Sequence, residues 1–338
     1  MLRLPKFDFV KPQSVGETVA LLERHGRSAK LIAGGTDVMP NLKHRLYDVE
    51  VVVGLSDVSE LRGVRVVEGG ALQIGAMTTL EEIEAHPLVV ARAPGLAQAA
   101  HSVAGPIQRT MGTLGGNVCL DTRCVYINQT HFWRKALGYC LKKDGTVCHV
   151  VKGGKSCVAA ASNDTATMLV ALDAKLTIRS VAGSREVAIR DFYKADGIDN
   201  RKLAPNELLV SVTVPAPKTA SWSGYAKLRP RATIDFPKLS VAVAFTTNTV
   251  GDDAGVMTDA TLVVSAIAAT PRLISGVAEI ARGRKPDDPA AIAAIGARAQ
   301  KVTVPLTNLD GDTEYRRAMV PVFVKRAFLA ARPAGEGR

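Results

Sequence analysis

All five cysteines of the chain lie between residues 119 and 157. The surrounding segment, 119–158, has no sustained hydrophobic period apart from a short helical pattern at about 132–137. A loop of ~40 residues without secondary structure is unusual inside a compact domain. Something other than a hydrophobic core must therefore hold this segment in place, and a bound metal would do so.

The cysteine spacing is wide and has no close pairs. After Cys124, the next three follow at intervals of sixteen, eight and nine residues, at Cys140, Cys148 and Cys157. Four thiolates suit either a tetrahedral zinc ion or a [4Fe–4S] cluster, and structural zinc sites usually bring their cysteines in close C-x₂₋₄-C pairs. The spacing favours a cluster, while zinc and unligated thiols stay open. Cys119, beside a glycine-rich loop, is expected to be a buried thiol and not a ligand.

Two glycine loops are the other unusual feature. The sequence Ala-Gly-Gly-Thr-Asp at 33–37 follows an expected strand, and Gly-Thr-Leu-Gly-Gly-Asn occupies 112–117. Neither loop matches the Rossmann or Walker pattern. Each could be an ordinary turn, but two such loops beside strands favour one shared ligand. A pyrophosphate fits, because nests of backbone N–H groups can neutralise it without lysines.

The order of elements predicts an α+β protein with two domains. A helix should run from the cap at Ser14 to Gly26. Strands are expected at 29–33, 50–53, 64–67, 72–74, 175–178, 186–189 and 208–214, with helices at 88–100 and 164–172. After the Pro-Ala-Pro sequence at 215–217, three strands at 224–228, 239–245 and 261–266 precede helices, the last at about 313–331. We therefore place one domain at 1–216, divided into 1–55 and 56–216, and another at 217–333.

Charge and hydropathy exclude several functions. The net charge is +11, but the basic residues are scattered and few aromatic residues accompany them, so no nucleic acid is expected. A solvated basic surface or an acidic protein partner explains the charge better. No apolar run approaches the ~20 residues of a membrane span. The first residues lack the apolar region of a secretory signal, which predicts a cytoplasmic protein. Because neither a Ser/His/Asp set nor paired carboxylates are evident, we expect the chain to carry electrons and a partner to carry out the bond chemistry.

The two glycine loops together resemble those of the FAD-binding medium subunit of the xanthine dehydrogenase family of molybdenum hydroxylases. The resemblance covers nearly the whole chain. It implies a two-part FAD-binding domain of the PCMH or CO dehydrogenase flavoprotein type, then a C-terminal α+β module with a three-stranded antiparallel sheet and helices. Most members of the family have no cysteine-rich insertion. The branch that has one is the β subunit of 4-hydroxybenzoyl-CoA reductase, whose insertion holds an extra [4Fe–4S] cluster.

The resemblance also implies particular site residues. The cysteine spacing is similar to that branch, so the cluster ligands would be Cys124, Cys140, Cys148 and Cys157. The implied FAD contacts are Leu31, Ile32, Ala33, Gly34, Gly35, Thr36, Asp37, Val38, Val103, Thr113, Leu114, Gly115, Gly116, Asn117, Tyr126 and Lys227. The sequence departs from the family at Tyr126, where an aspartate is common. Either Tyr126 contacts the flavin differently or Asp121 takes over.

The function implied by the resemblance is electron transfer within a larger complex. Reduced ferredoxin would pass electrons to the [4Fe–4S] cluster and then to FAD. They would continue to two [2Fe–2S] clusters on a small subunit and to a molybdenum cofactor on a large subunit, in a heterohexamer with two copies of each chain. There a phenolic aryl-CoA thioester would lose its ring hydroxyl. One alternative is a flavoprotein subunit of a molybdenum hydroxylase that oxidises an aromatic or N-heterocycle; another is a non-redox binding module with structural zinc.

Overall fold

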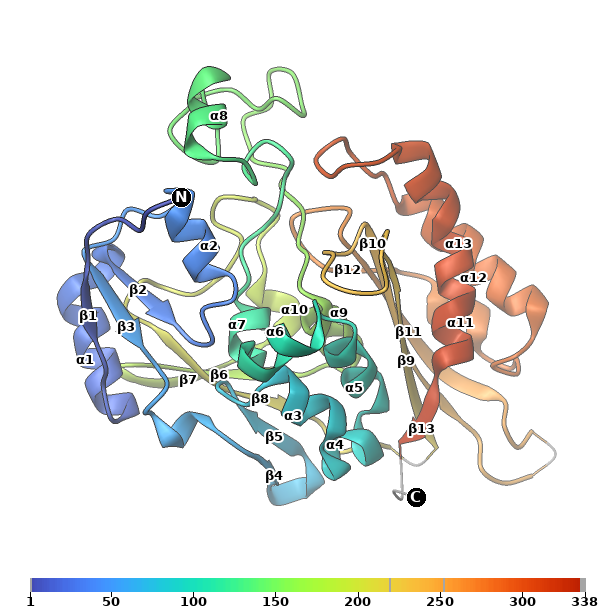
Figure 1. Ribbon diagram of the computed structural model, residues 1–338. Helices are drawn as coiled ribbons and strands as arrows, with labels where there is room; N and C mark the ends of the chain where they lie inside the picture. Colours follow the sequence, from blue (N-terminus) through green and yellow to red (C-terminus); the bar gives the residue numbers. More distant parts are fainter. Residues whose placement is uncertain (1, 219, 252, 335–338) are drawn as a thin grey trace.

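Three β-sheets divide the protein into three units that follow one another along the chain (Figure 1). The computed structural model describes residues 2–218, 220–251 and 253–334. The first sheet is parallel, whereas the second and third are antiparallel. Among the described residues, no helix is both long and apolar enough to cross a membrane.

The first unit is a small α/β layer. Its elements are β1 (Asp8–Val10), α1 (Val15–His25), β2 (Ala29–Ile32), α2 (Val38–Lys43) and β3 (Val51–Gly54), and the sheet order is β1-β3-β2. Helix α1 begins after Ser14, whose Oγ accepts the N–H of Glu17 at 3.1 Å, and ends at Gly26, where φ is 51°. The predicted helix and the two predicted strands are confirmed. Strand β2 ends directly before the first glycine loop, and helix α2 begins directly after it. These two elements therefore fix both ends of the loop.

The second unit is an antiparallel sheet with short helices packed against it. Its strands are β4 (Val64–Val66), β5 (Leu72–Gly75), β6 (Lys175–Ser180), β7 (Gly183–Ala188) and β8 (Leu208–Val214), in the order β4-β5-β8-β6-β7. Its helices are α3 (Leu80–Ala85), α4 (Pro87–Arg92), α5 (Pro94–His101), α6 (Pro106–Met111), α7 (Leu114–Val118), α9 (Asp164–Ala171) and α10 (Ile189–Phe192). Short 3₁₀ turns lie at Gly26–Ser28, Ser59–Leu61 and Glu68–Gly70.

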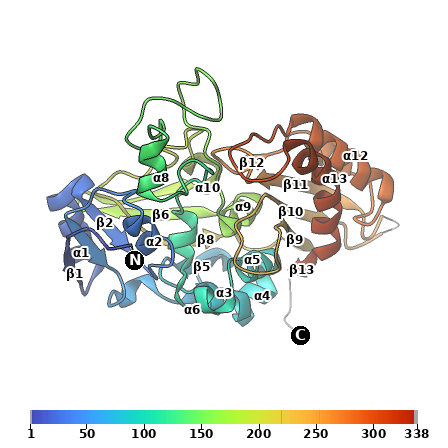
Figure 2. The ribbon, with the colours of Figure 1, turned by 45° about the horizontal axis from the view of Figure 1, so that its top comes forward.

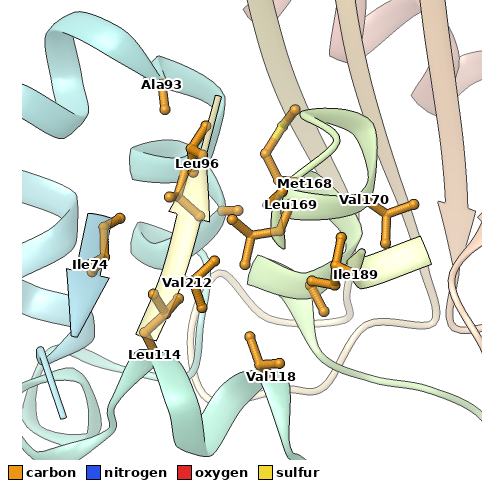
Figure 3. Packing of buried hydrophobic residues seen from close by; sticks show 14 of the residues in the cluster. Ile74, Ala93, Leu96, Leu114, Val118, Met168, Leu169, Val170, Ile189 and Val212 are labelled. Atoms are coloured by element: carbon orange, nitrogen blue, oxygen red, sulfur yellow. The ribbon is translucent and has the colours of Figure 1, made fainter. Parts of the chain in front are cut away.

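The core of this unit lies between the sheet and the helices (Figure 3). Ile74 and Val212 from the strands meet Leu96 and Leu169 from the helices, and all four are fully buried. The helix predicted at 88–100 is two helices, because Pro94 has no N–H to donate and starts a new helix, α5. The predicted hairpin at 64–67 and 72–74 is confirmed as β4 and β5.

The cysteine-rich segment 119–158 extends beyond the sheets (Figures 1 and 2). Its one described helix is α8 (His131–Ala136), which matches the predicted helical pattern. The rest makes only isolated bridges, such as Arg123 with Ala160. At its base, buried Cys124, Cys140 and Cys157 form a small apolar cluster of their own with Ile127 and Ala159. Cysteine side chains therefore make up three of the five buried residues in this small core.

The third unit is an antiparallel sheet with helices on it. Its elements are β9 (Ser221–Leu228), β10 (Leu239–Thr247), β11 (Met257–Ser265), β12 (Arg272–Leu273), α11 (Val277–Ala281), α12 (Pro289–Val302), α13 (Thr313–Ala330) and β13 (Arg332–Ala334). The three predicted strands are the long central ones, β9, β10 and β11. The short strands β12 and β13 extend this sheet at its two edges, so it has five strands in the order β12-β11-β10-β9-β13.

The second and third units share one core. Tyr225 and Ala242 of the third unit belong to the same buried cluster as the helices of the second. At the contact, the N–H of Gly95 donates to Ser223 Oγ at 2.9 Å. This packing holds the third unit beside the residues before α6, where the N–H of Ile234 donates to the Ala104 carbonyl at 3.0 Å.

Candidate functional site

A cavity of about 540 Å³ lies where the three units meet. The first unit contributes residues around the 33–38 loop, the second contributes the 112–117 loop and the segment 201–209, and the third contributes Ile234 and Phe236. Its size is typical of a cleft for a small molecule or cofactor. The two glycine loops predicted to share a ligand therefore line the same cavity, although they are far apart in the sequence.

The first glycine loop presents backbone donors. Gly35 has φ +72°, a conformation that side-chain-bearing residues rarely adopt. A side chain at Gly34 would overlap the Met111 carbonyl, so Gly34 is where the first loop packs against the second. In the described part of the chain, the N–H groups of Gly34, Gly35 and Thr36 donate to no protein acceptor. Oriented and unpaired N–H groups beside the start of helix α2 form a site that attracts an anion.

The second glycine loop forms the start of helix α7, and most of its backbone donors are already engaged. The N–H of Leu114 donates to the Thr78 carbonyl at 2.9 Å, and that of Gly115 to the Ala76 carbonyl at 2.8 Å. The N–H of Gly116 donates to Thr113 Oγ1, which caps the helix at 3.1 Å. A Cβ on Gly115 would stand 2.7 Å from the Ala76 Cβ. Among the described residues only the N–H of Thr113 in this loop has no protein acceptor, so the loop supplies mainly a wall and close packing.

One wall of the cavity is charged. Burial and the nearby charge of Arg201 lower the pKa of Lys30 to about 8, and Lys30 Nζ lies 3.6 Å from the Tyr47 ring centroid. Burial alone would raise the pKa of Asp121, but the adjacent cations outweigh it and the pKa is lowered. Asp121 therefore stays ionised beside Lys30 and Arg201. These groups give one end of the cavity a polar and mainly basic character.

Most of the sixteen predicted FAD contacts line this cavity. The lining includes Leu31, Ala33, Gly34, Gly35, Thr36, Asp37, Val38, Val103, Thr113, Gly115, Gly116 and Asn117. Ile32, Leu114, Tyr126 and Lys227 do not belong to it. Leu114 is fully buried in the core of the second unit, and Tyr126 packs against His149 in the cysteine-rich segment. Of the two possibilities for the family aspartate position, Asp121 is the residue that reaches the cavity wall.

Lys227 acts on the cavity wall indirectly. It is almost fully buried, pairs with Asp164 at 2.9 Å, and donates to the Ser102 carbonyl at 3.0 Å. Ser102 directly precedes Val103, which lines the cavity. Lys227 therefore holds the position of that wall and does not itself line the cavity.

Several lining residues carry no signal in the sequence. Lys30 directly precedes the predicted loop and could have been included with it. Arg201 and the residues 203–205 and 207–209 come from an irregular stretch and the start of β8, and Ile234 and Phe236 from a loop of the third unit. No motif marks these positions, because only the packing of the three units brings them to the cavity.

Three of the four predicted metal ligands, Cys124, Cys140 and Cys157, belong to one buried cluster, and none of the four lines the cavity. Cys124, Cys140, Cys148 and Cys157 are all buried. Burial raises the pKa of the Cys124 thiol to about 11, and the other three thiols lie near enough to add to the rise. Cys119 stands apart, half-buried on the wall of the cavity. Across the described residues, no group of three or more His, Cys, Asp or Glu side chains is positioned to hold a metal ion as it stands.

The cysteine-rich segment is tied to the first unit by charged contacts. Arg123 forms an ion pair with Asp37, the residue that precedes α2. At the other end of α2, Arg134 donates to the His44 carbonyl at 2.6 Å. Helix α2 starts from the first glycine loop, so both ends of the element behind that loop are held by the segment that carries the cysteines.

Comparisons with known proteins agree with this architecture. Residues 5–217 match the family model described as the FAD binding domain in molybdopterin dehydrogenase, and residues 224–331 match the CO dehydrogenase flavoprotein C-terminal domain. The chain is 31% identical to the carbon monoxide dehydrogenase medium chain of Hydrogenophaga pseudoflava, over 97% of each chain. It is 30% identical to the xanthine dehydrogenase FAD-binding subunit of Escherichia coli O157:H7, over 70% of this chain and 68% of that one.

A solved structure gives the same result. A chain of the carbon monoxide dehydrogenase from Hydrogenophaga pseudoflava, in a form that lacks the Mo-pyranopterin moiety, matches with a TM-score of 0.78 and 28% identity over 97% of this chain and 98% of that one. The protein therefore belongs to the family of FAD-binding flavoproteins of the molybdopterin dehydrogenases. Within that family the cavity between the glycine loops is the candidate FAD site.

Proposed function

We propose that this chain is the flavoprotein subunit of a molybdenum hydroxylase-type complex and that it binds FAD in the cavity between the two glycine loops. The observation that carries the proposal is the row of unpaired N–H groups at Gly34, Gly35 and Thr36. Similar chains include a nicotinate dehydrogenase FAD-subunit as well as the carbon monoxide and xanthine dehydrogenase chains. These names favour oxidation of a small substrate, with electrons flowing outward through FAD.

The residues present fit FAD. The free N–H groups of the first loop would bind its pyrophosphate, and the second loop would lie flat against it. Val103 and the apolar side chains of Ile234 and Phe236 would exclude water from the rest of the ligand. The bound flavin supplies two-electron redox chemistry, and this chain positions it and sets the charge around it.

The test is the flavin content of a wall variant. Val103→Trp places a large side chain in the cavity, whereas Val90→Trp changes an exposed valine on helix α4. We expect wild type and Val90→Trp to purify with about one FAD per chain and Val103→Trp with little. Absence of FAD from the wild-type protein, or full occupancy in Val103→Trp, would contradict the assignment.

A more specific function rests on the four cysteines. We infer that Cys124, Cys140, Cys148 and Cys157 hold a [4Fe–4S] cluster, as in the 4-hydroxybenzoyl-CoA reductase branch. Three of these buried thiols share one cluster, and the fourth, Cys148, lies near enough to act on Cys124, in a segment with little other core. These observations support the proposal. A cubane cluster takes one thiolate at each of four iron corners, so its ligands stand farther apart than those around a single zinc ion. Thiols that lie near one another without surrounding a single ion, as in the described residues, therefore fit a cluster better than a zinc ion.

In a complex of the 4-hydroxybenzoyl-CoA reductase type, electrons would flow inward, towards the molybdenum cofactor, and not outward as in the hydroxylase. Ferredoxin would reduce the cluster, and electrons would pass through FAD to [2Fe–2S] clusters and a molybdenum cofactor on a small and a large partner subunit. With two electrons and two protons, a phenolic aryl-CoA would lose its ring hydroxyl as water. The purified complex, taken here as two copies of each chain, should then turn over with reduced ferredoxin. Turnover only with an outward acceptor such as a quinone or NAD would favour the hydroxylase.

Metal analysis with two matched cysteine variants tests the cluster directly. We expect about four irons per chain and an anaerobic EPR signal upon reduction in wild type and in Cys119→Ser. Cys140→Ser should lose the iron. One zinc per chain without iron would mean that the cysteines hold a structural zinc ion and not a cluster. Full iron in Cys140→Ser would mean that Cys140 is not a ligand.

A further inference from the structure

Lys142 lies between the cysteines and the cavity, two residues after Cys140. Its side chain is only 9% exposed. Its ammonium group donates to three acceptors: Asp121 Oδ1 at 2.8 Å, Thr122 Oγ1 at 2.6 Å and the Gly197 carbonyl at 2.5 Å. An ammonium group has three hydrogens, so this buried cation is fully satisfied. A buried charge with so complete a set of partners has a fixed position.

On one side, Lys142 faces the flavin cavity through Asp121. Asp121 lines the cavity together with Lys30, Tyr47 and Arg201. Its Oδ1 accepts from Lys142, while its Oδ2 accepts from the Tyr47 hydroxyl at 3.4 Å. Lys142 therefore fixes the position of the Asp121 carboxylate and helps to balance its charge.

On the other side, Lys142 reaches the sulfur group. The Gly197 residue whose carbonyl accepts from Lys142 donates its own N–H to the Cys157 carbonyl at 2.8 Å. A Cβ on Gly197 would stand 2.7 Å from Cys157 Sγ, so this loop packs directly on the sulfur.

We propose that Lys142 and Asp121 form a fixed ion pair that couples the flavin site electrostatically to the four-cysteine site. Adding electrons to either site adds negative charge, and a nearby buried cation stabilises the reduced state. The effect is strong because charges interact over longer distances in a poorly solvated interior than in water. Lys142 is thus a positioning residue that raises the reduction potential at both sites, whereas Asp121 lowers that of the flavin. The inference deepens the proposed function and rests on FAD occupying the cavity.

The flavin midpoint potential of the purified protein, measured by spectroelectrochemical titration, tests the pair. Lys142→Met removes the cation that is hydrogen-bonded to Asp121 and leaves only Lys30 and Arg201 to balance it. We therefore expect the equilibrium constant for flavin reduction to fall about tenfold, which lowers the midpoint potential by about 30 mV for two electrons. Asp121→Asn should shift it in the opposite direction. The double variant should return towards the wild-type value, because the two charges act as a pair.

Two further variants separate charge from folding. Lys142→Arg keeps the charge and should restore most of the potential. Lys152→Met removes an exposed lysine of the same segment and should change nothing. Where iron is bound, its potential should also fall in Lys142→Met. Equal flavin potentials in wild type, Lys142→Met and Asp121→Asn, all with FAD bound, would overturn this inference alone. A wild-type protein without FAD would instead overturn the proposed function. If Lys142→Met does not fold, the flavin potential of Asp121→Asn is the test. An increase supports the inference, and an unchanged potential contradicts it.

Discussion

The two glycine loops look alike in sequence, yet they differ in what their backbones do. In the first loop, the N–H groups of Gly34, Gly35 and Thr36 have no acceptor in the described chain. In the second, Leu114, Gly115 and Gly116 all donate to protein oxygens. The first loop therefore has several backbone donors available to a ligand, whereas the second mainly packs against the protein. Glycine serves both purposes, because it permits unusual backbone angles and close approach.

The glycines also differ in what a side chain would meet. Gly34 lies against the second loop, Gly35 needs its left-handed backbone, Gly115 lies against Ala76, and Gly116 has only Thr113 Oγ1 nearby, at 3.1 Å. Replacing each in turn therefore separates loss of packing from loss of ligand binding. Folding stability should decrease most in Gly34→Ala and least in Thr113→Ala.

Gly34→Ala should have the largest effect. The new Cβ would overlap the Met111 carbonyl, so the two loops would have to separate. We expect a loss of about 2–3 kcal/mol in the free energy of unfolding, together with loss of FAD. Urea unfolding and flavin content measure the two effects. Gly16→Ala, on helix α1 with ample space, is the matched control and should not destabilise the protein.

Gly35→Ala should be milder for folding but still serious for FAD. An alanine at φ +72° is strained by about 1–2 kcal/mol. Relief of that strain would turn the donors of the first loop away from the cavity, so we expect FAD affinity to fall about tenfold or more, which is about 1.4 kcal/mol. Titration of the apoprotein with FAD, followed by fluorescence quenching, gives the affinity. Unchanged affinity would mean that these N–H groups are not the donors.

Gly116→Val should separate binding from stability. The position faces the cavity, and its one close neighbour is a side-chain oxygen. We expect the variant to fold but to purify without the yellow colour of FAD, since the backbone wall could no longer approach the ligand. A yellow Gly116→Val protein would show that the second loop does not lie against the flavin.

Thr113→Ala should have the smallest effect. It removes the side-chain cap of helix α7, which accepts the Gly116 N–H at 3.1 Å. Loss of such a cap costs about 1 kcal/mol, visible as a small decrease in the urea midpoint. FAD content should stay near the wild-type value. Marked loss of FAD would instead assign a direct role to the Thr113 hydroxyl.

The sequence predicted local structure well where a local cause exists. The cap at Ser14, the hairpin at 64–67 and 72–74, and the three long strands of the last unit follow from side-chain type and spacing. Pro94 divides the helix predicted at 88–100, and this break has a local cause in the sequence, because proline lacks an N–H. The edge strand β13 had no such signal, because pairing with β9 depends on the return of the chain after α13.

By itself, the sequence determined which backbone stretches could approach a ligand closely and which sulfurs could act together, because glycine and cysteine carry those properties wherever they lie. Only the tertiary structure decided which glycine loop has free donors, because an N–H is engaged or free according to its neighbours in space. It also decided that Asp121 reaches the cavity, that Lys227 acts through Ser102, and that Lys142 stands between the two sites. Such relations join residues from different units, and their cause is packing over long sequence separations.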